Sequence, residues 1–483
     1  MTIVLNDPGL LRFENRIGDR WVAAGSASIA VTNPATGEVI GHVPRFGAHE
    51  TRRAIEAAAA AFPAWRAQTA GDRATILRNL SGLLIEHVED LALILSSEQG
   101  KSLAEARGEI RGSAAYVLWF AEEGRRAYGD VIPSPWPNRK VLTTREPVGV
   151  VAAITPWNFP SSMIARKLGA ALAAGCTIVV KPASQTPLSA LVWGELCQRA
   201  GVPDGVFNCV TGSAVEIGGE LTIHPAVKKV TFTGSTSVGK TLMAQSAATM
   251  KKVSMELGGN APFIVFADAD LDRAVAGAID SKFRNSGQTC VCANRLLVHD
   301  SIYDTFNAKL AAAVKALKVG VGTEPGVQQG PLIDEAAVQK VEEHIADAVA
   351  RGARVLTGGA RHALGHSFFQ PTVMVDVPPD AQVAREETFG PLAPVFRFSD
   401  DDEAVRMAND TEFGLACYFF TKDLGRAFRV SEQLEYGIVG VNEGLVTTEV
   451  APFGGVKESG VGREGARSGL ADYMIEKYIC MGL

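Results

Sequence analysis

The chain has 483 residues, of which 47% are hydrophobic and 21% are charged, and its formal net charge is -6. A chain of this length is expected to fold into two or more domains, and its composition excludes an intrinsically disordered protein. Because the charge shows no basic excess, a nucleic-acid-binding protein is not expected.

Composition also bears on where the protein resides. No stretch approaches about 18 uncharged apolar residues, so no membrane span is expected, and residues 1–11 lack the apolar core of a signal peptide. The seven cysteines, an odd number without framework spacing, fit a reducing compartment. We therefore expect a soluble, cytoplasmic protein. The eight histidines lack the spacing of metal ligands, so no metal site is expected.

The first third of the chain is expected to be helical from about residue 50 to 125. Residues 53–61 are rich in alanine, and residues 72–87 place apolar side chains at helical spacing. The proline-rich stretch 133–137 then interrupts helix formation and marks a boundary or an excursion from the main domain.

Beyond this stretch, short apolar runs alternate with helical patterns. Strands are expected at 148–154, 177–180, 206–210 and 227–233, and helices at 162–173, at 188–200 and from Ser237 onward. Such alternation predicts βαβ units around a parallel sheet. A second series, from about 262 to 442, predicts a second α/β domain. Segment 472–481 is β-prone and is expected to pair outside its own domain.

Cys290 follows a polar turn, Gly287-Gln-Thr289. A single cysteine is more often a small buried apolar residue, but a polar approach containing glycine suits a thiol that faces a cleft. A thiol of ordinary pKa, about 8.5, needs a base or local dipoles before it can attack a carbonyl.

Two other residues are candidates for such support. Glu256 ends an expected strand and precedes two glycines, which would let it approach a site closely and act as a base. Asn158 follows strand 148–154, where α/β proteins place ligand-binding loops, and its amide can donate to an oxyanion. Taken singly, these strings also fit an ordinary helix end and an ordinary turn.

Seven strings occur in the order typical of one family, and on them the chain resembles the aldehyde dehydrogenase superfamily. They are Thr155-Pro-Trp-Asn-Phe-Pro160, Val180-Lys-Pro-Ala183, Phe232-Thr-Gly-Ser235, Glu256-Leu-Gly-Gly259, Gly287-Gln-Thr-Cys290, Glu386-Glu-Thr-Phe-Gly-Pro391 and Pro452-Phe-Gly-Gly455. The resemblance implies an α/β fold with a Rossmann-type cofactor domain (1–124 and 147–257), an α/β catalytic domain (258–458) and a small β oligomerisation element (125–146 and 459–483). It also implies a homo-oligomer, and we expect a tetramer.

The resemblance implies catalytic roles as well. Cys290 would attack the aldehyde, Asn158 and the Cys290 backbone N–H would hold the oxyanion, and Glu256 would activate the water that releases the acid. A Cys-His hydrolase is a rival interpretation, but the resemblance places no histidine in the base role. A relative that releases its product to coenzyme A and a non-catalytic relative are two more rivals. Retention of Glu256 argues against the relative that releases its product to coenzyme A. Retention of both Cys290 and Glu256 argues against the non-catalytic relative.

Residues 234–239 follow an expected strand and open a helix, as a phosphate-binding turn does, although Thr236 replaces the middle glycine of the usual Gly-x-Gly-x-x-Gly pattern. The resemblance assigns cofactor contacts to Thr155, Pro156, Trp157, Gly234, Ser235, Gly239 and Leu257, and contacts with the nicotinamide riboside to Glu387 and Phe389. Relatives that prefer NAD often carry glutamate at the position of Ser184. Because serine would not repel a 2′-phosphate and Lys181 adds a positive charge, we expect NADP to be preferred over NAD.

Three further features resemble the succinate-semialdehyde dehydrogenase group. They are Phe283-Arg-Asn285 with Cys290-Val-Cys-Ala-Asn-Arg295, Ile164-Ala-Arg-Lys167, and Gly462-Arg-Glu-Gly465 with the tail Tyr478-Ile-Cys-Met-Gly-Leu483. Arg166 and Arg284 would bind the carboxylate of a small acid semialdehyde, unless they are surface or domain-pairing charges. Thr447 and Thr448 would line the same pocket and narrow it. Since one methylene changes selectivity by only about 1–3 kcal/mol, succinate and glutarate semialdehyde both stay open.

The remaining cysteines form the last set of expectations. Cys292 could close a disulfide with Cys290 under oxidation, as related proteins suggest, or could simply be a packed thiol. The other five lie in apolar contexts and are expected in the core: Cys176, Cys197, Cys209, Cys417 and Cys480.

Overall fold

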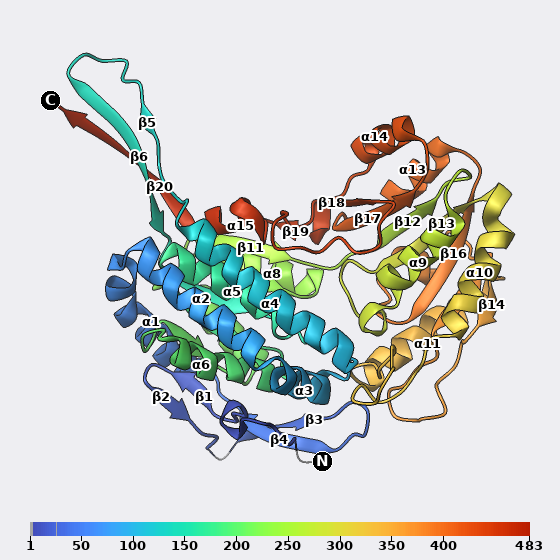
Figure 1. Cartoon of the computed structure of the whole chain (residues 1–483), viewed down its shortest axis with the longest axis horizontal. Coiled ribbons are helices and arrows are strands. Elements are labelled where there is room, and N and C mark those ends of the chain that lie inside the picture. Colours follow the sequence, from blue (N-terminus) through green and yellow to red (C-terminus); the bar gives the residue numbers. More distant parts are fainter. Residues whose placement is uncertain (1–2, 26) are drawn as a thin grey trace.

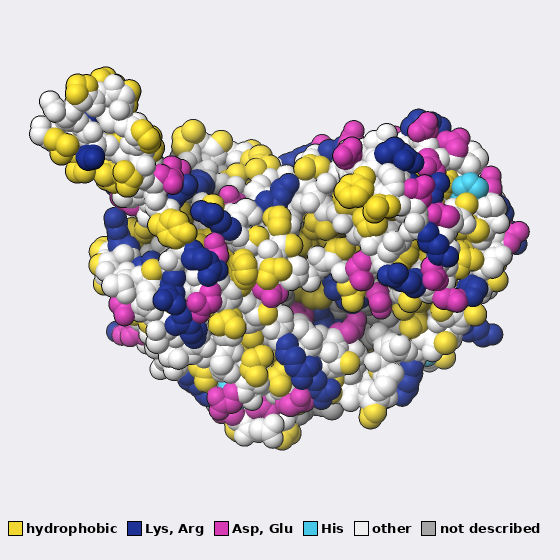
Figure 2. Space-filling view, turned by 45° about the horizontal axis from the view of Figure 1, so that its top comes forward, with side chains coloured by type: hydrophobic (Ala, Val, Ile, Leu, Met, Phe, Trp, Pro, Cys, Tyr) yellow, Lys and Arg dark blue, Asp and Glu magenta, His cyan; other side chains and the backbone are white. Residues whose placement is uncertain are grey.

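In the computed structural model, which describes residues 3–25 and 27–483, two α/β units lie side by side and a narrow sheet projects from one of them (Figure 1). Each unit has one central sheet covered by helices, so the expected α/β architecture with largely parallel sheets is confirmed. In the space-filling view, the surface is hollowed between the two units (Figure 2).

The first unit is built on a six-stranded sheet of order β19-β11-β10-β7-β8-β9, parallel except for β19. Its strands are β7 (Val150–Ile154), β8 (Thr177–Lys181), β9 (Phe207–Cys209), β10 (Val227–Thr233), β11 (Lys252–Glu256) and β19 (Gly460–Val461). Its helices are α1 (Ala48–Ala67), α2 (Ala70–Glu86), α3 (Val88–Gln99), α4 (Leu103–Gly124), α5 (Ser162–Ala174), α6 (Leu188–Ala200), α7 (Ala214–Ile223), α8 (Thr236–Ala247) and α15 (Ala466–Ala471).

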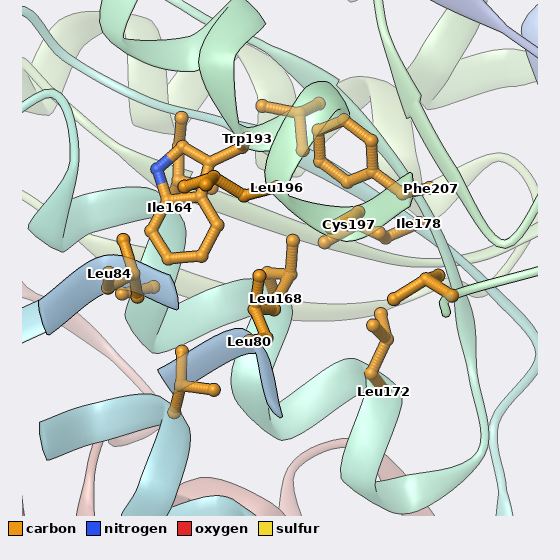
Figure 3. Packing of buried hydrophobic residues seen from close by; sticks show 14 of the residues in the cluster. Leu80, Leu84, Ile164, Leu168, Leu172, Ile178, Trp193, Leu196, Cys197 and Phe207 are labelled. Atoms are coloured by element: carbon orange, nitrogen blue, oxygen red, sulfur yellow. The ribbon is translucent and has the colours of Figure 1, made fainter. Parts of the chain in front are cut away.

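The core of this unit explains the placement of α5. Leu168 of α5 and Trp193 of α6 are both fully buried, and Leu80 of α2 packs in the same cluster (Figure 3). Truncating a leucine in such a site costs about 2–5 kcal/mol of stability. The helix ends at Gly175, whose φ of 93° is the left-handed conformation that favours glycine. Packing and cap together fix α5 behind the loop that carries Asn158.

The second unit has a seven-stranded sheet of order β14-β15-β16-β13-β12-β17-β18, parallel except for the pair β14–β15. Its strands are β12 (Ala261–Val265), β13 (Ala293–His299), β14 (Arg354–Thr357), β15 (Thr372–Val375), β16 (Leu392–Phe398), β17 (Ala416–Phe420) and β18 (Ile438–Val441). Its helices are α9 (Leu271–Lys282), α10 (Tyr303–Lys315), α11 (Glu335–Ala350), α12 (Gln382–Arg385), α13 (Asp401–Asn409) and α14 (Leu424–Gln433).

The projecting sheet has the order β20-β6-β5 and joins distant parts of the chain. Strand β20 (Met474–Gly482) pairs antiparallel with β6 (Arg139–Pro147), which also pairs with β5 (Val131–Ile132). The expectation that Cys480 lies in the core is wrong, because β20 projects from the molecule and leaves this thiol exposed. Cys176, Cys197, Cys209 and Cys417 are buried as expected.

The small elements complete the chain. They are β1 (Asn15–Ile17), β2 (Arg20–Val22), β3 (Ser28–Thr32) and β4 (Val39–Pro44), with 3-10 turns η1 (Pro8–Leu10), η2 (Arg284–Gly287), η3 (Asp300–Ile302) and η4 (Lys457–Ser459). Over residues 3–25 and 27–483, no helix is long and apolar enough to cross a membrane. The same residues contain no cluster of three or more potential metal ligands.

The expected elements are present with small shifts at their ends. The strand expected from residue 148 begins at Val150, because Gly149 adopts a φ of 128° that breaks the extended run. The helix expected from residue 72 begins two residues earlier at Ala70, since the Thr69 side chain accepts from the Asp72 N–H and caps it. The helix expected from Ser237 begins at Thr236, and the strand expected at 206–210 is confined to Phe207–Cys209.

Candidate active site

The candidate residues gather where strands of the first sheet end. Asn158 follows the carboxyl end of β7, Lys181 ends β8 and Glu256 ends β11. Open parallel sheets bind ligands at this edge. The segment before β13 of the second unit brings Cys290 to the same place, so the site lies between the two units.

Cys290 is partly exposed and lines two neighbouring cavities, of about 320 Å³ and about 210 Å³. The backbone before it is strained, because Asn285 and Ser286 have φ values of 52° and 55°. A Cβ on Gly287 would lie 2.1 Å from the Gly390 carbonyl oxygen, so only glycine fits there. Burial raises the pKa of the Cys290 thiol to about 12, so the resting group is the thiol.

Asn158 lines the smaller cavity together with Cys290. The residue is buried, and its side-chain amide donates to the Gln288 carbonyl at 3.0 Å. An amide nitrogen carries two hydrogens, so one of them stays available for a ligand oxygen.

Glu256 is buried beside the two cavities, although it lines neither of them in the described residues. Neither of its carboxylate oxygens has a hydrogen-bond partner in the described part of the chain. Burial, reinforced by Glu464 and opposed by Lys167 and Arg166, raises its pKa well above the usual range. Lys167 in turn donates to Thr233 at 2.7 Å and to Glu464.

The smaller cavity has the residues to hold a nicotinamide cofactor. It is lined by Pro156, Trp157, Asn158, Thr233, Gly234, Ser235, Leu257, Gly258, Cys290, Glu387 and Phe389. One oxygen of Glu387 accepts from the Gly259 N–H at 3.2 Å, which leaves the other for a ribose hydroxyl. Burial raises the pKa of Glu387 to about 7. Phe389 meets Trp157 edge to face, with ring centres 5.5 Å apart.

Four residues predicted to contact the cofactor lie outside that cavity lining. A Cβ on Gly239 would lie 2.4 Å from a Leu257 methyl, so this glycine lets Leu257 pack against α8. The Thr155 N–H donates to the Lys181 carbonyl. The Lys181 ammonium donates to the Pro182 carbonyl at 2.8 Å, and burial lowers its pKa to about 8. Ser184 is partly exposed in the loop after β8.

The larger cavity is lined by both predicted carboxylate-binding arginines, together with Thr447 and Thr448. Arg166 is buried, with its guanidinium 4.8 Å from the Tyr116 ring centre and 4.4 Å from that of Phe453. Its Nε and Nη1 have no hydrogen-bond partner among the described residues. Arg284 is partly exposed, and its guanidinium lies 5.4 Å from the Phe159 ring centre. Such an arrangement can bind a small anion.

The sequence did not single out Tyr116 and Phe453. Tyr116 lies on a helix without a local signal of function, whereas Phe453 stands in a family string whose function the sequence does not state. The Tyr116 hydroxyl donates to the Thr448 carbonyl at 3.0 Å and so supports the loop at the cavity wall.

Cys292 is buried and is not among the described residues that line the two cavities. Its thiol donates to the carbonyls of Ser281 at 3.1 Å and Lys282 at 3.0 Å, and burial raises its pKa. A disulfide with Cys290 would require it to leave both partners, and this role stays a prediction.

Comparison with known proteins shows what the whole chain is similar to. The model of the Aldehyde dehydrogenase family matches residues 21–479. Glutarate-semialdehyde dehydrogenase of Pseudomonas aeruginosa is 61% identical over 479 residues, covering 99% of each chain. Succinate-semialdehyde dehydrogenase [NADP(+)] of Escherichia coli is 61% identical over 480 residues, covering 99% of this chain and all of the relative. 3-Sulfolactaldehyde dehydrogenase of Pseudomonas putida is 60% identical and covers 99% of each chain. The crystal structure of succinate-semialdehyde dehydrogenase from Burkholderia pseudomallei superposes with a TM-score of 0.98 at 61% identity, over 99% of this chain and 100% of that one.

Proposed function

The chain belongs to the aldehyde dehydrogenase family, and we propose that it oxidises aldehydes that carry an acidic group, succinate semialdehyde first among them. Enzymes of this family use NAD or NADP. The observation that carries the proposal is that Cys290 lines both cavities, one holding two arginines and the other the candidate nicotinamide contacts. A nucleophile at that junction can meet an aldehyde on one side and a hydride acceptor on the other.

In the proposed reaction the Cys290 thiolate adds to the aldehyde carbon, and the carbonyl oxygen becomes an oxyanion. The free N–H of the Asn158 amide and the Cys290 backbone N–H donate to that oxyanion. The Cys290 proton must first leave to water, because the resting group is the thiol. The lining of the smaller cavity would hold a nicotinamide, which would supply the hydride acceptor. Loss of a hydride from the same carbon would leave a thioester on Cys290.

Glu256 is the proposed base for hydrolysis of that thioester. It takes a proton from water, the oxygen adds to the acyl carbon, and the Cys290 thiolate departs to leave the free acid. Because neither of its oxygens has a hydrogen-bond partner among the described residues, the carboxylate can turn toward Cys290 without breaking a hydrogen bond to them. Lys167 and Arg166 favour its ionised form, against burial and Glu464.

Arg166 and Arg284 are the proposed partners of the substrate carboxylate. A carboxylate in the larger cavity would give Arg166 the hydrogen bonds that the described residues leave unmade. The cavity of about 320 Å³ also leaves room for the extra methylene of glutarate semialdehyde. Because close relatives carry both names, glutarate semialdehyde is the second candidate.

We propose NADP as the preferred cofactor. Ser184 places no carboxylate in the loop after β8 that would repel a 2′-phosphate, and Lys181 ends the preceding strand. The Escherichia coli relative named for NADP(+) supports the same preference.

We also propose that the projecting sheet (β5, β6 and β20), which is drawn from segments 125–146 and 459–483, is the oligomerisation element of a homotetramer. Several of its apolar side chains are exposed: Val131 at 82%, Trp136 at 47%, Tyr478 at 58% and Leu483 at 79%. Exposed apolar side chains gathered on one small sheet are typical of an interface. Light scattering on the intact protein measures the assembly directly, and a monomeric mass would contradict it.

The experiment that tests the proposed function is a kcat/KM panel of three- to six-carbon aldehydes, with and without a terminal carboxylate, with each cofactor. We expect acid aldehydes to exceed their neutral counterparts at least tenfold and NADP to exceed NAD. Reduced cofactor should form at the same rate without coenzyme A. A requirement for coenzyme A, or a preference for neutral aldehydes, would contradict the proposal.

A further inference from the structure

Lys101 is a buried cation against the loop that carries Asn158. It lies between α3 and α4, and its side chain is 0% exposed. The ammonium donates to the Glu109 carboxylate at 2.6 Å and to the main-chain carbonyl of Asn158 at 2.8 Å. It also lies 3.9 Å from the Phe159 ring centre. Lys101 therefore bonds directly to the backbone of the candidate oxyanion donor.

Glu109 holds the same loop on its other side. Its Oε1 accepts from the backbone N–H groups of Ser161 at 2.9 Å and Ser162 at 3.1 Å, where α5 begins, while its Oε2 accepts from Lys101. Both carboxylate oxygens of Glu109 are therefore engaged in hydrogen bonds, although the residue also lines the larger cavity. Lys101 and Glu109 together hold the loop at Asn158 and at the start of α5.

Glu105, one helical turn earlier on α4, holds the segment that leads to the nucleophile. Its Oε1 accepts from the Asn285 N–H at 2.7 Å. The Asn285 side-chain amide donates to the Asn158 carbonyl at 3.0 Å and so ties the two segments together. Because Asn285 is in a left-handed conformation, its N–H needs a partner outside ordinary secondary structure.

The chemistry of this cluster favours a role in geometry over one in stability. A buried ion pair gains little net stability relative to apolar side chains of similar size, because both charges lose their hydration. A misplacement of about 1 Å in the reacting groups, by contrast, slows a reaction about 100-fold. An ion pair that holds the Asn158 backbone therefore affects the reaction rate mainly through the position of the Asn158 amide.

We propose that Lys101, Glu109 and Glu105 are positioning residues that set the separation of the Asn158 amide and the Cys290 thiol. In the described structure Lys101 lines neither cavity, whereas Glu105 and Glu109 reach the wall of the larger one. All three act on the acylation of Cys290 through Asn158. The proposal rests on the proposed roles of Cys290 and Asn158, and it does not depend on which aldehyde is the substrate.

A double-mutant cycle of Lys101→Met with Asn158→Ala in the full-length protein tests this. Two reactions of Cys290 are measured: acylation by 4-nitrophenyl acetate, which forms an oxyanion, and alkylation by iodoacetamide, which does not. We expect each single substitution to slow acylation by about 10- to 1,000-fold. Alkylation should change by less than about threefold, and adding Lys101→Met to Asn158→Ala should slow acylation by less than about threefold more.

Two matched comparisons guard against a loss of folding. Glu105→Gln keeps an acceptor for the Asn285 N–H and should retain the wild-type acylation rate, whereas Glu105→Ala should slow acylation. If Lys101→Met does not fold, the difference between these two variants tests the positioning role. Lys229→Met removes another buried lysine, one that bonds to Ser254, and any effect it has should add to that of Asn158→Ala.

Additive effects of Lys101→Met and Asn158→Ala, or equal slowing of acylation and alkylation, would overturn the positioning role and leave the proposed function standing. An Asn158→Ala protein that acylates at the wild-type rate would overturn the oxyanion role in the proposed function, and the positioning role with it.

Discussion

Replacing Arg284 by methionine removes one proposed carboxylate contact while keeping an unbranched side chain in the cavity wall. Arg284 has no ion pair with the described residues and is partly exposed, so its loss leaves no buried charge behind. A hydrogen bond to a charged group contributes about 1.5–3 kcal/mol. At about 1.4 kcal/mol per tenfold, kcat/KM for succinate semialdehyde should fall about 10- to 150-fold.

The assay compares succinate semialdehyde with butanal, a four-carbon aldehyde without the carboxylate, by the rate of reduced-cofactor formation. We expect kcat/KM for butanal to stay within about threefold of wild type, because it never forms the lost contact. Arg429→Met, at an exposed arginine of α14, is the matched control and should leave both substrates unchanged. Equal losses for both aldehydes in Arg284→Met would refute carboxylate recognition and indicate a structural arginine.

Four further predictions concern single side chains. Ser184→Glu should lower kcat/KM with NADP by at least about tenfold, because the new carboxylate repels the 2′-phosphate; a wild type that favours NAD more than about tenfold would contradict the reasoning. Glu256→Gln should release one equivalent of reduced cofactor per site in a burst and then stop, since hydrolysis loses its base; sustained turnover would exclude that role. The KM for cofactor should rise as the pH falls through about 7, where Glu387 becomes protonated and accepts hydrogen bonds less well. If Glu387→Gln shows the same pH dependence of KM, the titrating group is a different residue. Peroxide should inactivate wild type reversibly with loss of two thiols, whereas Cys292→Ala should form no disulfide. Equal thiol loss in both proteins would contradict a disulfide between Cys290 and Cys292.

The site residues that could be predicted from the sequence are those that stand in a short, recognisable sequence motif. Cys290 and Asn158 stand in polar turns after strands, where α/β proteins place ligands, and the structure brings them to one cavity. Lys101 gave no such signal, because a lysine between two helices is normally solvated. The tertiary packing of α4 and the Asn158 loop around it is what buries the side chain.

The opposite error occurs at the C-terminus. Cys480 lies in an apolar run that is typical of a buried strand, yet β20 belongs to a projecting sheet with exposed faces. Local hydrophobicity predicts that a strand is buried. It does not distinguish burial within the same chain from burial against a second chain.

Mass spectrometry of the trapped acyl enzyme tests the central claim most directly. Glu256→Gln is mixed with succinate semialdehyde and NADP, quenched in acid and digested. We predict that the peptide containing Cys290 gains the mass of one succinyl group, in proportion to the cofactor reduced. Cofactor reduction without an adduct on Cys290, or with the adduct on another residue, would contradict the account.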